Sequence, residues 1–336
     1  MKKPATYYKF FLGFSLVLIL ISLAFLYQTV FKTVIAKNKN VQSKEIIYHI
    51  QQIKKLGAVN AYAEFKKQNK ILNLTRQHNA VHFFGEALYS LNGLKGITIC
   101  DSEFNYGCYH SVIGNALAQE GLGEISKIND YCLTTDDFLK CQHGIGHGVI
   151  AFLGYDFKNL TQALNICDGL KKRDPIGGCF TGIFMEYNFQ TMLDTDGKTR
   201  PLNDSSPLYP CDGLPENFQK PCLYEQSNWW LEVLPDNFDN KINKIDTYCN
   251  KFDGAPKEAC FIGLGVHLPN RTNWDSNKAL TSCQKLKSPE AFSFCIYGLA
   301  SEFYSRPEYA AKAKQLCDLL NPIDSSNCKK RVGINF

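Results

Sequence analysis

The sequence predicts an all-α protein: a single-pass N-terminal membrane anchor followed by an α-solenoid of disulfide-stapled helical hairpins. Three observations support this prediction. The first is an uncharged apolar run over residues 10–31. The second is a set of fourteen cysteines, all after residue 99, in close pairs that recur every 33–43 residues. The third is an apolar periodicity before the pairs, such as Ile125, Ile128 and Cys132, that is typical of an amphipathic helix.

The apolar run has the length of a transmembrane helix. It contains 22 residues, enough to cross the hydrocarbon core of a bilayer. A cleaved signal peptide has a shorter apolar core and a small-residue cleavage site, whereas this run ends in Gln-Thr-Val-Phe. We therefore expect a retained signal anchor. Lysines flank the run on both sides, so they do not fix its orientation.

The cysteines indicate the compartment. An even number of cysteines spread through a chain is typical of an oxidising environment. We therefore expect residues 32–336 in the periplasm or the extracellular space and the head, residues 1–9, in the cytoplasm. The sequence contains no Cys-x-x-Cys, which excludes a zinc ribbon, a thioredoxin-type redox site and covalent attachment of c-type haem.

The segment between the anchor and the cysteines, residues 32–95, is expected to form an amphipathic helix and a first repeat without a staple. Ile46, Ile50 and Ile53 lie on one helical face, and Arg76 occupies the place of a second cysteine in the repeat phase. Residues 96–336 form the cysteine-paired repeats. The 37 basic and 32 acidic residues are nearly balanced and form no basic stripe with aromatics, so a nucleic-acid partner is not expected.

The regular spacing predicts a disulfide within each repeat, joining the end of a first helix to the start of a second. Loops of this length contribute about 2–3 kcal/mol per bridge to stability on the chain-entropy model. Fourteen cysteines allow many other pairings, and only the regularity of the repeat selects this one. The predicted bridges are Cys100–Cys108, Cys132–Cys141, Cys167–Cys179, Cys211–Cys222, Cys249–Cys260, Cys283–Cys295 and Cys317–Cys328.

Paired cysteines on helical hairpins at this period resemble the disulfide-stapled relatives of Sel1-like and tetratricopeptide (TPR-like) repeats in secreted cysteine-rich proteins. The similarity is one of spacing and covers roughly residues 96–330. It implies a curved solenoid with a concave binding face and no particular chemistry. One polar insertion, residues 188–210, interrupts the regular spacing and is expected to form a surface loop.

The stretch Cys-Gln-His-Gly-Ile-Gly-His-Gly at residues 141–148 combines a cysteine, two histidines and three glycines, and it is the strongest candidate for a functional site. His143 and His147 are four apart and therefore share one face of a helix. Its glycines predict that a neighbouring helix or a bound group approaches the bare backbone. A second copy at residues 76–82 places His78 and His82 at the same spacing.

Five of the seven histidines reuse two repeat positions. His78, His110 and His143 come two residues after the second-cysteine position, and His82 and His147 come six after it. Gly114 takes the later position in the middle unit. Equivalent positions on packed helices lie about 8–10 Å apart, so these imidazoles can reach one ion. Glu86 extends the first face, and Glu186 and His267 lie seven residues after later cysteines.

Three interpretations of the histidines remain open. They are ligands of a transition metal such as zinc, copper or iron, axial ligands of a non-covalently held haem, or repeat residues that bond carbonyls at the hairpin turns. The pairs lack the glutamate of His-Glu-x-x-His, which excludes that peptidase class. Only three methionines occur, which argues against a methionine-lined copper(I) carrier. The adjacent Trp229 and Trp230 are expected in the core.

Two classes of function follow. The first is a membrane-anchored extracytoplasmic scaffold that binds a protein or peptide on the concave face of the solenoid. The alternative is a metal- or haem-binding protein, with oxidoreductase activity as one form of it, whose site is the histidine cluster. The sequence names no catalytic residue, and whether the protein is an enzyme stays open at this point.

Overall fold

The computed structural model describes residues 44–192 and 198–333, and all regular structure in these ranges is helical. The prediction of an all-α fold is therefore confirmed. The predicted head and anchor lie outside the described residues. Among the helices that are described, none combines the length and apolar character that a membrane span requires.

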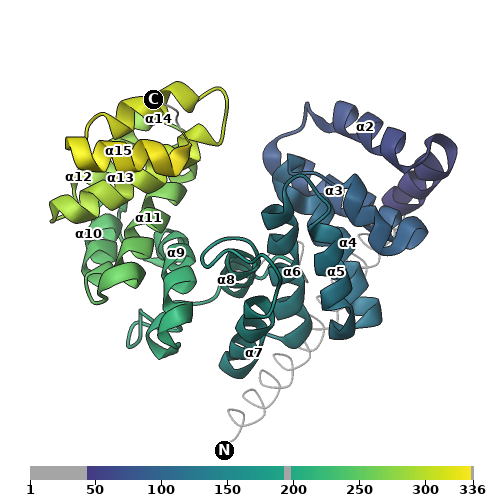
Figure 1. Ribbon diagram of the computed structural model, residues 1–336, viewed down its shortest axis with the longest axis horizontal. Coiled ribbons are helices and arrows are strands. Elements are labelled where there is room, and N and C mark those ends of the chain that lie inside the picture. Colours follow the sequence, from purple (N-terminus) through teal and green to yellow (C-terminus); the bar gives the residue numbers. More distant parts are fainter. Residues whose placement is uncertain (1–43, 193–197, 334–336) are drawn as a thin grey trace, which may run out of the picture.

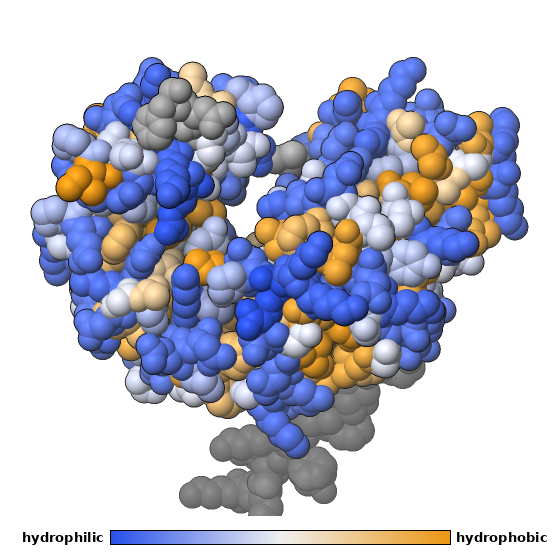
Figure 2. All heavy atoms as spheres, in the orientation of Figure 1, coloured by the Kyte–Doolittle hydropathy of each residue, from blue (hydrophilic) through white to orange (hydrophobic). Residues whose placement is uncertain are grey.

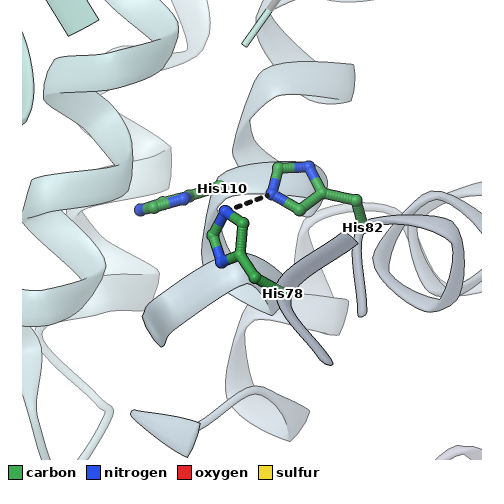
Figure 3. Close-up of side chains that lie close together, drawn as sticks. All are labelled: His78, His82 and His110. Atoms are coloured by element: carbon green, nitrogen blue, oxygen red, sulfur yellow. Dashed lines mark hydrogen bonds between the residues drawn. The ribbon is translucent and has the colours of Figure 1, made fainter. Parts of the chain in front are cut away.

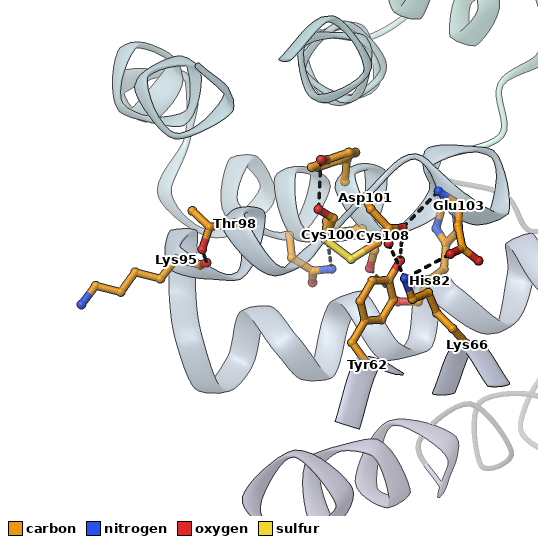
Figure 4. The surroundings of a disulfide bond; sticks show 12 residues. Tyr62, Lys66, His82, Lys95, Thr98, Cys100, Asp101, Glu103 and Cys108 are labelled. Carbon is orange, nitrogen blue, oxygen red and sulfur yellow. Dashed lines mark hydrogen bonds and ion pairs between the residues drawn. A yellow bond between two sulfur atoms is a disulfide. The ribbon is translucent and has the colours of Figure 1, made fainter. Parts of the chain in front are cut away.

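The first repeat contains no disulfide. Residues 44–56 are helical and are followed by α2 (Ala58–Asn69) and α3 (Leu74–Asn92). Two 3-10 turns, η1 (Gly93–Ile99) and η2 (Glu103–Tyr106), lead into α4 (Gly107–Glu120). Figure 4 shows how α2 is joined to the first staple: the Lys66 ammonium contacts Asp101 at 2.6 Å and Glu103 at 3.1 Å, and the Tyr62 hydroxyl donates to Asp101.

The rest of the described chain alternates between a first helix and a second helix of each repeat, except between α8 and α9, where the insertion stands in place of a first helix. The first helices are α5 (Ile125–Cys132), α7 (Phe157–Asp168), α10 (Phe238–Cys249), α12 (Ser276–Gln284) and α14 (Ala310–Cys317). The second helices are α6 (Phe138–Leu153), α8 (Cys179–Phe189), α9 (Glu216–Val233), α11 (Gly254–Arg271), α13 (Pro289–Tyr304) and α15 (Pro322–Val332). Short turns η3 (Leu122–Glu124) and η4 (Cys211–Gly213) precede α5 and α9.

All seven predicted disulfides are present, and no cysteine is free. Each joins cysteines 8 to 12 residues apart in sequence, with Cα atoms 5.3–5.7 Å apart, which is the usual separation for a disulfide. The staples support the prediction of an oxidising, extracytoplasmic compartment.

The second helices pack in chain order, α3 on α4, α4 on α6, α6 on α8, and so on to α13. Glycines allow some of these helices to touch backbone to backbone. A Cβ on Gly182 would lie 2.0 Å from the His143 carbonyl oxygen, and one on Gly263 would lie 2.0 Å from that of Tyr224. The repeated glycine three residues after the second cysteine is therefore a packing residue of the solenoid.

The stack of helices curves into an open C in which the second helices line the inner side (Figure 1). Figure 2 shows a gap between the two arms on the face that it displays. The α3–α4–α6 units form one arm and the α11–α13–α15 units form the other. This arrangement agrees with the solenoid expected from the repeat spacing.

The insertion between α8 and α9 is more than a surface loop. After the residues that are not described, it returns along α8, where the Arg200 N–H donates to the Asn188 carbonyl at 2.8 Å. The Arg200 guanidinium lies 3.6 Å from the centre of the Trp229 ring. Trp229 and Trp230 are fully buried, as predicted, and their indole N–H groups donate to carbonyls of Arg200 and Pro207.

Candidate metal centre

Five histidines from three consecutive second helices come together within one arm. His78 and His82 come from α3, His110 from α4, and His143 and His147 from α6. One ring nitrogen of each lies close enough to its neighbours to form two sets, His78–His82–His110 and His110–His143–His147, with nitrogens within 4.8 Å of one another in each set. Figure 3 shows the first set: a dashed line joins the ring nitrogens of His78 and His82, and the His110 ring lies beside them. The sequence-based prediction that these rings share one location agrees with this geometry.

The i,i+4 pairs bring their Nε2 atoms into direct contact. The separation is 3.1 Å between His78 and His82 and 3.0 Å between His143 and His147. The His110 ring lies between the two pairs, with its centre 4.5 Å from that of His147 and 5.6 Å from that of His78. The two pairs are thus the ends of one continuous cluster, with His110 common to both.

The outer nitrogens of three rings are held by acceptors. His78 Nδ1 lies 2.9 Å from the Phe104 carbonyl oxygen, which can only accept, so this nitrogen carries the proton. His143 Nδ1 lies 3.0 Å from the Thr181 hydroxyl, and that hydroxyl donates its own proton to the Gly178 carbonyl. The His143 nitrogen is therefore also the donor. In both rings the proton is on Nδ1, and the Nε2 lone pair faces the cluster.

The third outer acceptor is the carboxylate of Glu186. His147 Nδ1 donates to it over 2.9 Å. The carboxylate also accepts from the Tyr155 hydroxyl at 2.7 Å and from the backbone N–H groups of Thr191 and Met192. Burial opposes ionisation of Glu186, but these hydrogen bonds keep the pKa of the carboxyl below its usual value. A fixed carboxylate behind a histidine orients that ring for metal binding.

These contacts leave two lone pairs facing each other. His143 and His147 both carry their protons on Nδ1, so both Nε2 atoms, 3.0 Å apart, are bare. Two lone pairs at this distance repel unless a cation lies between them, either a proton or a metal ion. His110 adds a third nitrogen, since its Nε2 is buried and has no hydrogen-bond partner. A buried polar atom of this kind requires a partner.

Burial disfavours the protonated form of His82, His110 and His143. His110, His143 and His147 are 5%, 7% and 2% exposed. Burial, followed by repulsion from neighbouring imidazoles, holds the pKa of His110 and of His143 well below the usual value. The same causes lower the pKa of His82 to about 3. Neutral imidazole is the form that binds transition metals, so the site is chemically matched to them.

The distances favour a metal ion over haem. Metal–nitrogen bonds are about 2.0–2.1 Å long, so two nitrogens on one ion are about 3–3.4 Å apart when adjacent and about 4 Å apart when opposite. Both histidine pairs, at 3.0 and 3.1 Å, match adjacent ligands. The two axial ligands of a haem lie on opposite faces of the macrocycle, an arrangement that neither pair can provide.

The remaining candidates from the sequence take other roles. Neither set of three includes Glu86. Glu186 holds a histidine from outside the cluster. His267 lies on α11, where its Nε2 is 3.6 Å from a Glu225 carboxylate oxygen.

Two glycines of the stretch at residues 141–148 allow close packing of helices. A Cβ on Gly146 would lie 2.0 Å from the Cys179 carbonyl oxygen, and one on Gly148 would meet Leu117. Of the two groups expected to approach these glycines, a neighbouring helix and a bound group, the structure therefore shows the neighbouring helix.

Sequence reasoning missed most of the outer acceptors. Thr181 could have been found, because it occupies in α8 the repeat position that His143 occupies in α6. The Phe104 carbonyl and Tyr155 carry no sequence signal, since a turn and a distant side chain bring them to the site. The glutamine of each Gln-His motif is structural: Gln142 donates to Asn129 at 2.8 Å and ties α6 to α5.

Comparison with family models, with curated proteins and with solved structures gave no match to this chain. The resemblance to Sel1-like and TPR-like proteins therefore rests on the cysteine spacing and the helical hairpins alone.

Proposed function

We propose that this protein binds a transition metal ion through the histidine cluster, His78, His82, His110, His143 and His147. One observation carries the proposal: the bare Nε2 atoms of His143 and His147 face each other at 3.0 Å while their outer nitrogens donate to Thr181 and Glu186. Here acceptors hold the outer sides and leave the inner sides free to bind a cation.

We further propose that the site lies outside the cytoplasm, tethered to the membrane by residues 10–31. The disulfides support the compartment, and the charge-free sequence of that segment supports the anchor. Oxidised cysteines cannot serve as thiolate ligands, so imidazole is the main donor available to bind the metal. Zinc, copper and iron all accept imidazole nitrogen.

The test is the metal content of the full-length protein, purified in detergent and measured by elemental analysis with a visible spectrum. We expect near-stoichiometric metal, or a rise in melting temperature when Zn²⁺ or Cu²⁺ is added, since a ligand at 100 times its Kd stabilises by about 2.7 kcal/mol. His110→Ala removes a ligand from both sets of three histidines, whereas His143→Ala removes one only from the set His110–His143–His147.

His267→Ala is the matched control, because His267 is also a buried histidine on a second helix but belongs to neither set. It should leave metal binding unchanged. If wild-type protein holds no metal and gains no stability from added Zn, Cu, Fe or haem, the histidines are architectural and this proposal fails.

The second candidate is a scaffold that binds a protein or peptide in the hollow of the C. The observation in its favour is the gap between the arms in Figure 2, together with charged side chains on both arms. Lys140 of α6 and Glu302 of α13 act on each other electrostatically. Burial raises the pKa of Glu302, and Arg306, followed by Lys140, moderates this rise. A metal-free protein that binds an extended peptide, with loss of binding in Glu302→Gln, would favour this function.

A further inference from the structure

The middle helix of the cluster lacks its second histidine. In α3 and α6 the histidine two residues after the cysteine position is followed, four residues later, by another. In α4, His110 is followed by Gly114. The neighbouring pairs place their nitrogens 3.0–3.1 Å apart, so a ligand atom beside His110 is missing at the equivalent place. The Nε2 atom of His110 is correspondingly buried without a hydrogen-bond partner.

Met192 fills the space over Gly114. A Cβ built on Gly114 would meet the terminal methyl carbon of Met192 at 2.6 Å, so a side chain at position 114 and the methionine compete for one volume. The sulfur is one bond from that methyl carbon. The methyl end of the Met192 thioether therefore lies over Gly114, at the helix position where the repeat puts a histidine in the helices on either side.

The backbone of Met192 is held by the cluster's own carboxylate. Its N–H donates to Glu186 Oε1 at 2.9 Å, and the N–H and hydroxyl of Thr191 donate to Oε2 at 3.1 and 2.9 Å. The same carboxylate accepts from His147 at 2.9 Å. One group thus orients a histidine ring and anchors the methionine.

We infer that Met192 supplies a thioether ligand to the metal that His110 binds, which makes this a copper site with a preference for Cu(I) over Zn²⁺. The inference rests on the proposed function. Thioether sulfur is a soft donor that selects Cu(I), whereas imidazole alone accepts several metals. The small number of methionines argues against a methionine-lined copper(I) carrier, but one methionine, Met192, lies next to the cluster. Met185 also occupies the six-after-cysteine position, in the adjacent helix α8.

The test compares wild type with Met192→Leu, a volume-conserving change that removes only the sulfur. Full-length protein is loaded with Cu(I) under anaerobic conditions in ascorbate, and separately with Zn²⁺. X-ray absorption of the copper form should show a sulfur neighbour in wild type and only nitrogen neighbours in the variant. Cu(I) affinity should fall at least about tenfold, the usual loss when a metal site loses a supporting group, while Zn²⁺ affinity stays the same.

Two further variants complete the design. Met192→His should restore tight binding and shift the preference toward Zn²⁺, because it supplies the missing imidazole. Met185→Leu identifies which methionine provides the sulfur. Unchanged Cu(I) affinity and absorption in Met192→Leu would overturn the inference while leaving the histidine site intact. Absence of metal from wild type and variants alike would instead overturn the proposed function.

Discussion

Two buried histidine sites, on different units of the solenoid, behave in opposite ways. In the cluster formed by α3, α4 and α6, acceptors outside the site hold the Nδ1 atoms of three rings, and the Nε2 atoms of these rings face the cluster. In the α9–α11 pair, His267 Nε2 and Glu225 Oε2 face each other at 3.6 Å and neither has a hydrogen-bond partner. Burial raises the pKa of Glu225 to about 8, and burial, followed by repulsion from Arg271, lowers that of His267 to about 3. Both groups are therefore neutral at pH 7, so this contact is not an ion pair.

The difference shows what the fold adds to the histidines that we propose as metal ligands. Both regions use the same stapled hairpins and glycine contacts. The cluster gathers rings from three adjacent helices and anchors them from behind with Phe104, Thr181 and Glu186. The α9–α11 pair has one ring and one carboxyl and no outer acceptor. The outer acceptors, more than the histidines themselves, separate the two regions.

The largest effect is expected from removing one staple in each arm. The double variants Cys132→Ala/Cys141→Ala and Cys283→Ala/Cys295→Ala should each lower the free energy of unfolding by about 2–3 kcal/mol. Only the first should also weaken metal binding, because Cys141 fixes the start of the helix that carries His143. Chemical denaturation and metal titration measure the two effects separately. Equal loss of metal affinity in both variants would mean that the arms are not independent.

Glu186→Gln tests the outer acceptor alone. The amide keeps the size of the side chain but removes the charge that polarises His147, so metal affinity should fall about 10–100-fold. Competition against a chelator measures it. Glu225→Gln, the corresponding change at the α9–α11 pair, should not alter metal affinity. A Glu186→Gln protein with wild-type affinity would show that the carboxylate only anchors the insertion.

The sequence predicted the helices, the staples and the five histidines because each rests on local periodicity. Cys132 and Cys141 are nine residues apart, and His143 and His147 share a face within one turn. The role of the glycines was predicted less well, since Gly146 meets the Cys179 carbonyl of another repeat. Periodicity indicates that a helix surface is bare but does not identify the neighbouring group.

The insertion shows the same limit. Its polar composition predicts a surface loop, yet Thr191 and Met192 bond the carboxylate of Glu186, and Arg200 packs on Trp229. Those contacts join residues that the repeat phase leaves unrelated, and only the folded arrangement of α8 and α9 brings them together. The contacts of the insertion that bear on the choice of metal are therefore the ones that sequence patterns predict least well.

The smallest effect concerns the pH dependence of stability at the α9–α11 pair. In the unfolded chain the Glu225 carboxyl loses its proton near pH 4.5, whereas in the folded protein it keeps the proton to about pH 8. Between these values the folded state binds more protons than the unfolded state, so the free energy of unfolding falls as pH rises. Glu225→Gln should remove this slope, which is at most about 1.4 kcal/mol per pH unit.

The pKa of His267 determines the pH range in which the slope due to Glu225 can be measured alone. Its pKa falls from 6.5 to about 3 on folding, so between these values the unfolded state binds the extra proton and stability rises with pH. The two slopes oppose each other below pH 6.5, and only that of Glu225 remains between pH 6.5 and 8. Urea denaturation of the metal-free protein in this window should give a flatter profile for Glu225→Gln than for wild type, with His267→Gln unchanged from wild type. Identical profiles in all three would mean that Glu225 is ionised in the folded state and that the α9–α11 pair has a partner for its charge.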